Sequence, residues 1–358
     1  LSTRVVDAIT LHLQQRSEGA IDTYLSLDVP KIAECRERVR VLIHAESTER
    51  IALLTNTSDP LNVVASGLTW KSGDRVLLHE DEFPANVWPY LNLKRLGVEI
   101  DVIPKGKGHP TPQLIADSIS EKTKLVALSA VQFLTGYRAD LAAIGSLCRE
   151  KGIVFVVDGI QAVGAVRLDV QSMKIDALAA GCQKWQMGPH GSGWLYLTEE
   201  LQSKIQPAHV GWLAVEEPWN FFDYGQSLAS SARRFEGGTK NIPSLWGMEA
   251  ALSTLLEFGL EEIEGHILTL TQLLLDGLRS IDGVRVITPG GMNKRAGIVT
   301  IELGQGMNAE SVFRQLERRD MAIALRDGKL RYAPHFYNSA TDIELAISAT
   351  QEAIQQLY

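Results

Sequence analysis

An acid and a lysine follow two apolar segments in the middle of the chain. Residues 153–157 form a continuous apolar run rich in β-branched side chains, which predicts a strand buried on both faces of a parallel sheet, and Asp158 comes directly after it. A second apolar run at 177–180 ends shortly before Lys184. Because ligands bind at the carboxyl edge of open α/β sheets, we expect Asp158 and Lys184 to face one cavity.

A lysine amine and a carboxylate in one cavity are the pair that pyridoxal phosphate (PLP) requires. A lysine holds this cofactor as a Schiff base, and an acid beside the pyridine nitrogen lets the ring act as an electron sink. The alternative is a strand-end Asp158 that caps a turn and a surface Lys184, since both are common in proteins. The pair alone leaves these two interpretations open.

The sequence around the pair resembles a known family. DGIQAVG at 158–164 and MGPHGSGWLYL at 187–197 are similar to segments of the fold-type I PLP enzymes of the aminotransferase class V family. This family contains cysteine desulfurases, kynureninase and isopenicillin N epimerase. The resemblance extends over nearly the whole chain. It implies an α/β fold with a large domain built on a mainly parallel sheet and a smaller α+β C-terminal domain.

The resemblance also implies roles for residues around the cofactor ring. Lys184 is the Schiff-base lysine and Asp158 pairs with the pyridine nitrogen. Gln161 bonds the phenolic oxygen of the ring, and Ile160 lies against one ring face. Phe83 stacks on the ring where cysteine desulfurases use a His that also moves protons; without the resemblance, it would be ordinary core. Because Phe83 cannot titrate, proton transfer would fall more heavily on Lys184.

Small hydroxyl residues stand at the start of a predicted helix in TNTSDPLN at 55–62. The free N–H groups and partial positive charge of a helix N-terminus favour a phosphate, and Thr57 and Ser58 are well placed to hold one. Ordinary helix capping would explain the same residues. The segment is similar to the GTTEGIN-type phosphate-binding turn of the desulfurase-like members, which implies the phosphate role.

Two positions depart from the family pattern at the phosphate. Gln183 stands where a His usually precedes the lysine, and Gly181 replaces an upstream Ser. We expect Gln183 to contact the cofactor, with weaker or redistributed phosphate contacts. RFEGGTKN at 234–241 is similar to the family's RFEAGTPN element, which reaches the cofactor phosphate of the neighbouring subunit. The similarity gives Thr239 that role and implies a homodimer with active sites at the interface.

Two arginines near the C-terminus are candidates for substrate binding. Arg331 matches the arginine that binds the substrate α-carboxylate in relatives, a task suited to a planar guanidinium, and Arg326 would assist it. Without the family context, a surface ion pair would be the expectation. Desulfurases that form a persulfide carry a cysteine in the loop before this arginine. Residues 327–330 read DGKL and contain none, which disfavours persulfide chemistry.

The predicted function is a PLP-dependent enzyme acting on an amino acid, with Lys184 as Schiff base and acid/base group. Transamination is the leading reaction. A cysteine or cystine lyase and an epimerase are alternatives, because all three reactions begin with the same activated α-carbon. An alternative of another class is a non-catalytic scaffold that keeps the fold. The sequence does not identify the amino acid.

Length and composition set the remaining expectations. The 358 residues, 45% of them hydrophobic, allow one large and one small core. We expect an N-terminal helical segment at 1–25, a large PLP-binding domain at 26–255 and a small domain at 256–358. The chain begins at Leu1, partway into a segment similar to the family, so we expect further residues upstream.

The charge of the chain bears on its binding partners, and its cysteine content bears on its cellular location. The net charge of -8, without a basic stripe, gives no reason to expect nucleic acid as a partner. No apolar run approaches the ~20 residues of a membrane helix. The three cysteines are far apart and lack metal-ligand spacing, so we expect no metal and a reducing, cytoplasmic location.

Alternating apolar runs and helical patterns predict a βαβ chain with right-handed crossovers. The predicted strands of the large domain lie at 50–54, 75–79, 98–103, 124–129, 153–157 and 177–180, with an antiparallel strand at 194–197. Those of the small domain lie near 284–287 and 297–303. The main predicted helices lie at 1–17, 28–44, 112–119, 140–151 and 242–257, with three more in the small domain.

Overall fold

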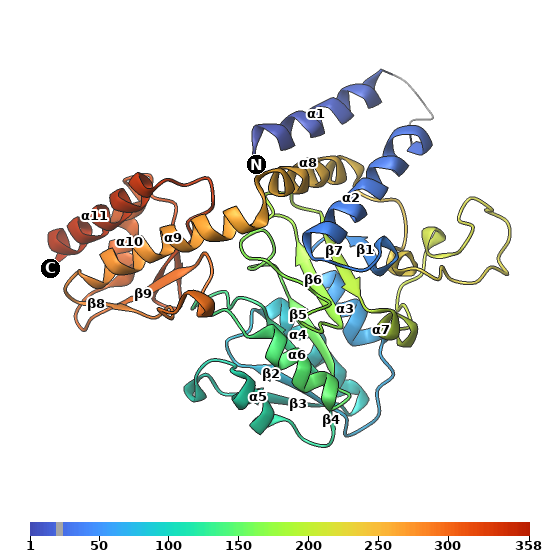
Figure 1. Ribbon diagram of the computed structural model, residues 1–358, viewed down its shortest axis with the longest axis horizontal. Helices are drawn as coiled ribbons and strands as arrows, with labels where there is room; N and C mark the ends of the chain where they lie inside the picture. The colour runs from blue at the N-terminus through green and yellow to red at the C-terminus, as the bar shows by residue number, and fades with distance from the viewer. Residues whose placement is uncertain (19–23) are drawn as a thin grey trace. The chain divides into compact units, whose positions relative to one another are not determined.

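The computed structural model describes residues 1–18 and 24–358 and has two compact units (Figure 1). The large unit comprises Leu1–Ala130 and Asp140–Gly259. The small unit comprises Leu260–Tyr358 together with Val131–Ala139, a short segment from the middle of the chain.

A seven-stranded sheet in the order β1-β7-β6-β5-β4-β2-β3 is the centre of the large unit. β7 runs antiparallel to both of its neighbours, and all the other strand pairs are parallel. Every strand predicted for this domain is present within one residue of its expected bounds. The strands are β1 (Ile51–Leu54), β2 (Arg75–His79), β3 (Glu99–Ile103), β4 (Thr123–Ser129), β5 (Val154–Asp158), β6 (Ala177–Gly181) and β7 (Gly193–Leu197).

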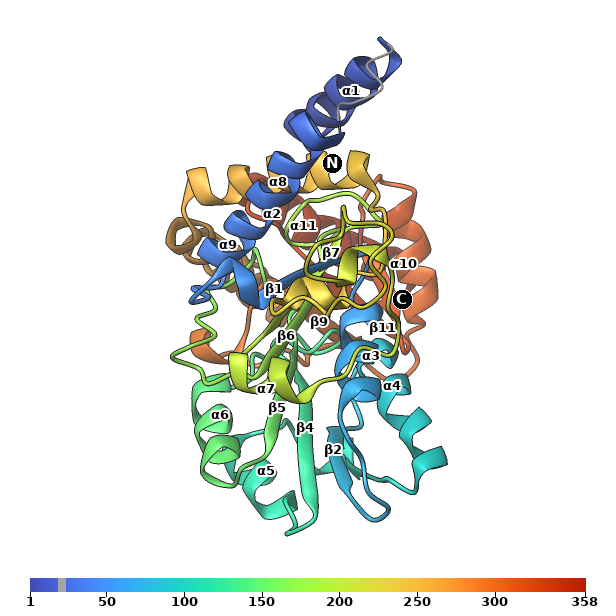
Figure 2. The same cartoon turned by 90° about the vertical axis from the view of Figure 1, so that its right-hand side faces the viewer.

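Helices cover both faces of this sheet, as the βαβ alternation predicted. Figure 2 shows α3 (Ser58–Gly67) and α4 (Trp88–Leu91) on one side of the strands, and α5 (Pro112–Ser118) and α6 (Leu141–Glu150) on the other. Alternate strand residues and the apolar stripe of α3 form one buried core. This core fixes the carboxyl ends of β2, β4, β5 and β6 along one edge.

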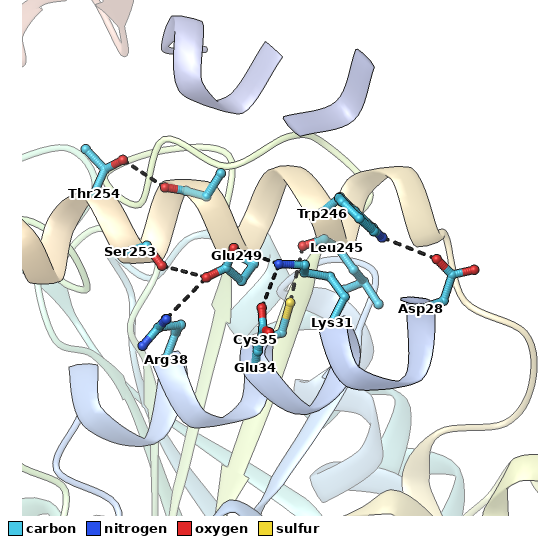
Figure 3. Close-up of polar contacts among 11 residues, drawn as sticks. Asp28, Lys31, Glu34, Cys35, Arg38, Leu245, Trp246, Glu249, Ser253 and Thr254 are labelled. Carbon is cyan, nitrogen blue, oxygen red and sulfur yellow. Dashed lines mark hydrogen bonds and ion pairs between the residues drawn. The ribbon is translucent and has the colours of Figure 1, made fainter. Parts of the chain in front are cut away.

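Three further helices of the large unit are α1 (Thr3–Ser17), α2 (Val29–Leu42) and α8 (Ile242–Phe258), and a short helix, α7 (Glu199–Lys204), was not predicted. α2 packs along α8 (Figure 3). The Cys35 thiol donates to the Leu245 carbonyl oxygen at 3.2 Å, and Glu249 accepts from Lys31 at 3.3 Å and from Arg38 at 3.2 Å. A thiol–carbonyl hydrogen bond and a charge cluster therefore hold the two helices together.

Asp28 stands directly before α2, a position at which an aspartate commonly caps the helix that follows. It precedes α2, but its carboxylate makes no capping hydrogen bond. The carboxylate instead accepts from Trp246 Nε1 at 3.3 Å and lies 3.6 Å from His12 Nδ1 (Figure 3 shows the Trp246 contact). Asp28 is buried and links α1, α2 and α8, so a tertiary contact has replaced the local one.

The small unit is built on a four-stranded antiparallel sheet in the order β10-β11-β9-β8. Its core gathers apolar residues of the strands and of three helices. The strands are β8 (Val284–Val286), β9 (Val299–Leu303), β10 (Ala324–Arg326) and β11 (Lys329–Tyr332), and the helices are α9 (Leu260–Arg279), α10 (Ala309–Glu317) and α11 (Ala340–Leu357).

The hairpin of β10 and β11 was not predicted. Its two-residue turn consists of Asp327 at φ 49° and Gly328 at φ 69°. Positive φ at both residues is typical of a type I′ turn, for which Asp-Gly is a preferred pair. The dipeptide was therefore a usable signal. Within residues 1–18 and 24–358, no helix has the combined length and hydrophobicity that crossing a bilayer requires.

Candidate active site

Asp158 is the last residue of β5 and is almost completely buried. Its Oδ1 accepts from the Ile160 amide at 3.0 Å, whereas Oδ2 is buried and has no hydrogen-bond partner. Burial raises the pKa of Asp158 to about 6, and the Ile160 N–H and the positive charge of Lys184 oppose this rise. A buried carboxylate oxygen without a donor is costly unless a bound group supplies one.

Lys184 lies in the loop that follows β6, the strand beside β5. Its Nζ is 5.5 Å from the centre of the Phe83 ring. Phe83 follows β2 and is 41% exposed, which is unusual for a Phe at a sheet edge. The structure thus brings Asp158, Lys184 and Phe83, which are far apart in the sequence, to one edge of the sheet.

Gln161 and Ile160 lie in the turn after Asp158, and both are buried. Gln161 Oε1 accepts from Trp185 Nε1 at 3.0 Å, so the residue after Lys184 fixes the orientation of this amide. Sequence reasoning did not single out Trp185. Its position beside Lys184 was the only available signal, because its contact with Gln161 spans two different loops.

Thr57 precedes α3 but does not cap it with its side chain. Its hydroxyl accepts from the Gly181 amide at 2.9 Å, which joins the start of α3 to the end of β6. A Cβ on Gly181 would lie 2.5 Å from Gln183 Oε1 and 3.1 Å from Thr57 Oγ. Thr57, Gly181 and Gln183 therefore meet at one point, with Ser58 next to them as the first residue of α3.

Thr239 is exposed on the turn before α8, and the residues on either side of it hold this turn in place. Glu236 is buried and accepts from Lys240 at 2.7 Å, from Arg36 at 2.7 Å and from the Leu53 amide at 2.6 Å. Burial would raise the pKa of Glu236, but Arg36 and Lys240 outweigh it and hold the pKa below its ordinary value. The turn is therefore fixed against β1.

Glu82 is a second buried carboxyl group at this edge, and sequence reasoning missed it. Its Oε1 accepts from the Ser129 amide at 2.8 Å, and its Oε2 accepts from Ser129 Oγ at 2.5 Å and from Asn86 Nδ2 at 2.9 Å. Ser129 ends β4 and lies opposite Asp158 in register. Burial raises the pKa of Glu82 to about 7 despite the bonds from Asn86 and Ser129, and the charge of Asp158 adds to the rise.

Arg331 and Arg326 both belong to the small unit. Arg331 lies in β11, is half-buried, and donates from Nε to the Phe133 carbonyl oxygen at 2.6 Å. Burial and the positive charge of Arg326 lower the pKa of Arg331 to about 10. Arg326 is exposed at the end of β10 and donates to its neighbour's carbonyl oxygen at 2.9 Å. The two guanidinium groups form a positive region on this hairpin.

In the large unit, the sheet edge carries a nucleophilic amine, an aromatic ring face and a carboxylate with an unpartnered oxygen. Such a set can hold a planar, cationic heterocycle and can form a covalent bond to a carbonyl group through Lys184. Phe83, the side chain beside Lys184, cannot take up or release a proton.

Comparison with known proteins places the chain among PLP enzymes. A family model described as aminotransferase class-V matches residues 4–357. A probable cysteine desulfurase of Methanothermobacter thermautotrophicus is 28% identical over 340 residues, covering 90% of this chain and 83% of that protein. An uncharacterized aminotransferase of Bacillus subtilis, YcbU, is 29% identical, with coverages of 89% and 83%.

Solved structures agree with the fold. The apo cysteine desulfurase of Thermococcus onnurineus superposes with a TM-score of 0.89 at 26% identity, covering 99% of this chain and 92% of that one. The cystine C–S lyase C-DES, solved with its product cysteine persulfide, gives a TM-score of 0.91 at 23% identity, with coverages of 98% and 94%.

The predicted fold class is confirmed by these superpositions and by the mainly parallel seven-stranded sheet. A scaffold without catalytic function is not supported, because the family and the named relatives are enzymes. A C-DES variant was also solved with glycine linked to its PLP cofactor. Because the family model matches residues 4–357, the chain belongs to the aminotransferase class-V family, a family of PLP-dependent enzymes.

Proposed function

We propose that the protein catalyses transamination of an amino acid, with Lys184 as the acid/base group of the site. The observation that supports this most directly is the neighbourhood of the lysine. Its Nζ lies 5.5 Å from the centre of the Phe83 ring. A titratable side chain at the position of Phe83 could share the proton transfers with Lys184, but a phenyl ring cannot. Transamination needs one base that takes a proton and returns it nearby, and such a site provides one.

The residues at the sheet edge fit PLP. The unpartnered Oδ2 of Asp158 would accept from a protonated ring nitrogen, which offers the buried N–H donor that this oxygen lacks. Phe83 presents an exposed ring face for stacking, and Lys184 supplies the amine. We assign ring contacts also to Ile160 and Gln161. Thr57, Ser58 and Gln183 would hold the phosphate, because all three lie where α3 begins.

Bound PLP supplies an electron sink that makes the α-proton of an amino acid acidic. Asp158, in its ionised form, holds the positive charge at the ring nitrogen on which that effect depends. Lys184 Nζ would hold the cofactor and, once the substrate amine has displaced it, the free amine would take and return the α-proton. Arg331 binds the substrate α-carboxylate through two parallel N–H donors, and Arg326 adds positive charge to the hairpin.

Carbon–sulfur bond cleavage is the second candidate. The hairpin before Arg331 turns at Asp327 and Gly328 and carries no cysteine, so a persulfide on this loop is excluded. The solved C-DES structure is that of a cystine C–S lyase. Cystine has a good leaving group that requires no second acid, so a site with one lysine could also release a sulfur product directly.

Product analysis tests the proposal. The holoenzyme would be incubated with a panel of amino acids and cystine, with and without a 2-oxo acid, beside Lys184→Ala. We expect an oxo acid that forms only when an acceptor is present and only with Lys184. Pyruvate and ammonia from cystine without an acceptor would identify a lyase, and inversion at the α-carbon an epimerase. No lysine-dependent product or spectral change with any of them would refute the proposal.

We also propose a homodimer in which Thr239 reaches the cofactor phosphate of the partner subunit. The support is the exposed position of Thr239 on a turn that Glu236 fixes from behind. Light scattering of the holoenzyme would give the mass, and Thr239→Val should weaken PLP binding. A cytoplasmic location is proposed as well, since Cys35, Cys148 and Cys182 are all buried and form no disulfide bonds.

A further inference from the structure

Val131–Ala139 belongs to the small unit although α6 and β4 flank it in the sequence. The segment folds as a turn in which the Gln132 amide donates to the Tyr137 carbonyl oxygen at 2.8 Å and the Gly136 amide to the Gln132 carbonyl oxygen at 2.9 Å. Gly136 has φ 72°, and a Cβ there would lie 2.4 Å from the Ile298 carbonyl oxygen. The turn therefore lies directly against the chain that enters β9.

The side chain of Gln132 fixes the shape of this turn. Its Oε1 accepts from the Leu134 amide at 2.8 Å, from the Thr135 amide at 2.6 Å and from Thr135 Oγ at 3.0 Å. The side chain is buried, so these hydrogen bonds are shielded from water. The Leu134 and Thr135 amides share planar peptide groups with the Phe133 and Leu134 carbonyls. Because both N–H groups point toward Gln132, the two carbonyl groups must point the other way.

Two neighbouring residues of the small sheet bind two consecutive carbonyl groups of the turn. Arg331 Nε donates to the Phe133 oxygen at 2.6 Å, and Thr300 Oγ donates to the Leu134 oxygen at 2.5 Å. Arg331 of β11 and Thr300 of β9 lie opposite each other in register. The turn is therefore clamped to the sheet by a cross-strand pair, and one member of that pair is the arginine assigned to the substrate.

The contact at Nε restricts how the guanidinium can turn. An arginine has several rotatable bonds, but its guanidinium is planar, so a hydrogen bond at Nε fixes the plane and the direction of the terminal nitrogens. Carboxylate recognition by two parallel N–H groups depends on that direction. We propose that Gln132 is a positioning residue for the substrate carboxylate, because it holds the Phe133 carbonyl group where that group orients Arg331. The inference rests on the proposed role of Arg331.

The test compares two probes that differ only in the carboxylate. L-alanine and ethylamine would be titrated into the holoenzyme, with the absorbance of bound PLP as the readout, for wild type, Gln132→Ala, Gln132→Glu and Arg331→Ala. We expect Gln132→Ala to weaken L-alanine binding by about tenfold and to leave ethylamine unchanged, since misplaced binding groups lose affinity for the group they bind. Gln132→Glu retains an acceptor oxygen and should stay close to wild type.

Thr300→Val provides a second test that leaves Gln132 intact. It removes the donor to the Leu134 oxygen, keeps a β-branched side chain in β9, and should weaken L-alanine binding selectively as well. Equal losses for both probes, or no loss in either variant, would overturn the inference and leave Gln132 a purely structural residue. If Arg331→Ala binds L-alanine as wild type does, or if wild type shows no preference for L-alanine over ethylamine, the proposed role of Arg331 fails instead.

Discussion

Replacement of Glu82 by Gln is the most direct test of the charges at the sheet edge. Glu82 is buried and lies close enough to Asp158 for the two charges to interact. Gln has the shape of the protonated acid but cannot ionise. Its amide can accept from the Ser129 amide and can donate to Ser129 Oγ. The Asn86 amide, which donates to Oε2 of Glu82, must turn over so that its Oδ1, which has no partner in the wild type, accepts from the new NH2 group. The substitution therefore removes one titration and leaves the packing in place.

The magnitude follows from the pKa of Glu82, which burial raises from 4.5 to about 7. This rise corresponds to about 3 kcal/mol in favour of the folded protein when Glu82 is protonated, at ~1.36 kcal/mol per pH unit. Because the pKa is higher in the folded state, the stabilising contribution is complete below about pH 4.5 and is lost as the pH rises through 7. The wild-type protein should lose this free energy across that window, and Glu82→Gln should not.

Urea unfolding of the cofactor-free protein, followed by tryptophan fluorescence from about pH 5 to about pH 8, would measure the difference. We expect the free energy of unfolding of Glu82→Gln to rise relative to wild type by about 2–3 kcal/mol over this range. Glu121→Gln, at an exposed glutamate of the same unit, is the control and should show no such trend. Parallel pH profiles for Glu82→Gln and wild type would refute the assignment of a raised pKa.

Three other substitutions test separate parts of the structure. Asp158→Asn should weaken PLP binding to the cofactor-free protein by tenfold or more, measured by fluorescence titration, because a charge-assisted hydrogen bond is lost; unchanged affinity would contradict the assignment. Glu249→Gln removes the half-buried charge that binds Lys31 and Arg38, and should lower the free energy of unfolding in urea at pH 7 by about 1–3 kcal/mol. Gly136→Ala should lower it by about 2–3 kcal/mol, because φ is positive and Ile298 leaves no room.

Local patterns were enough to locate the strands and their functional ends. The apolar runs before Asp158 and Lys184 are segments of β5 and the adjacent β6, as the sequence indicated. The burial of Glu82 could not be predicted in the same way. Glu82 is one of three acids in the segment EDE at 80–82, and its tertiary contact with Ser129 distinguishes it from the exposed Glu80 and the half-buried Asp81.

Two residues at the start of helices make contacts with distant segments instead of capping those helices. Thr57 could have been a helix cap or part of a binding site, and its hydroxyl in fact accepts from Gly181. Asp28 had the sequence context of a cap, yet it binds Trp246 of another helix. In both cases a side chain that can cap a helix found a partner far away in the sequence, which periodicity and propensity cannot reveal.

Gly181 and Gln183 are best understood as one change to the family pattern. The sequence presents them as two separate losses, a missing hydroxyl and a missing imidazole. In the structure, a side chain at 181 would meet Gln183 Oε1 at 2.5 Å, so the Gln183 amide occupies the space that a serine side chain would need. The Gln183 amide can therefore occupy its observed position only because residue 181 has no side chain. Gly181→Ser alone would displace the Gln183 amide and disturb Thr57. Replacing Gly181 by Ser and Gln183 by His together would avoid the contact with the Gln183 amide.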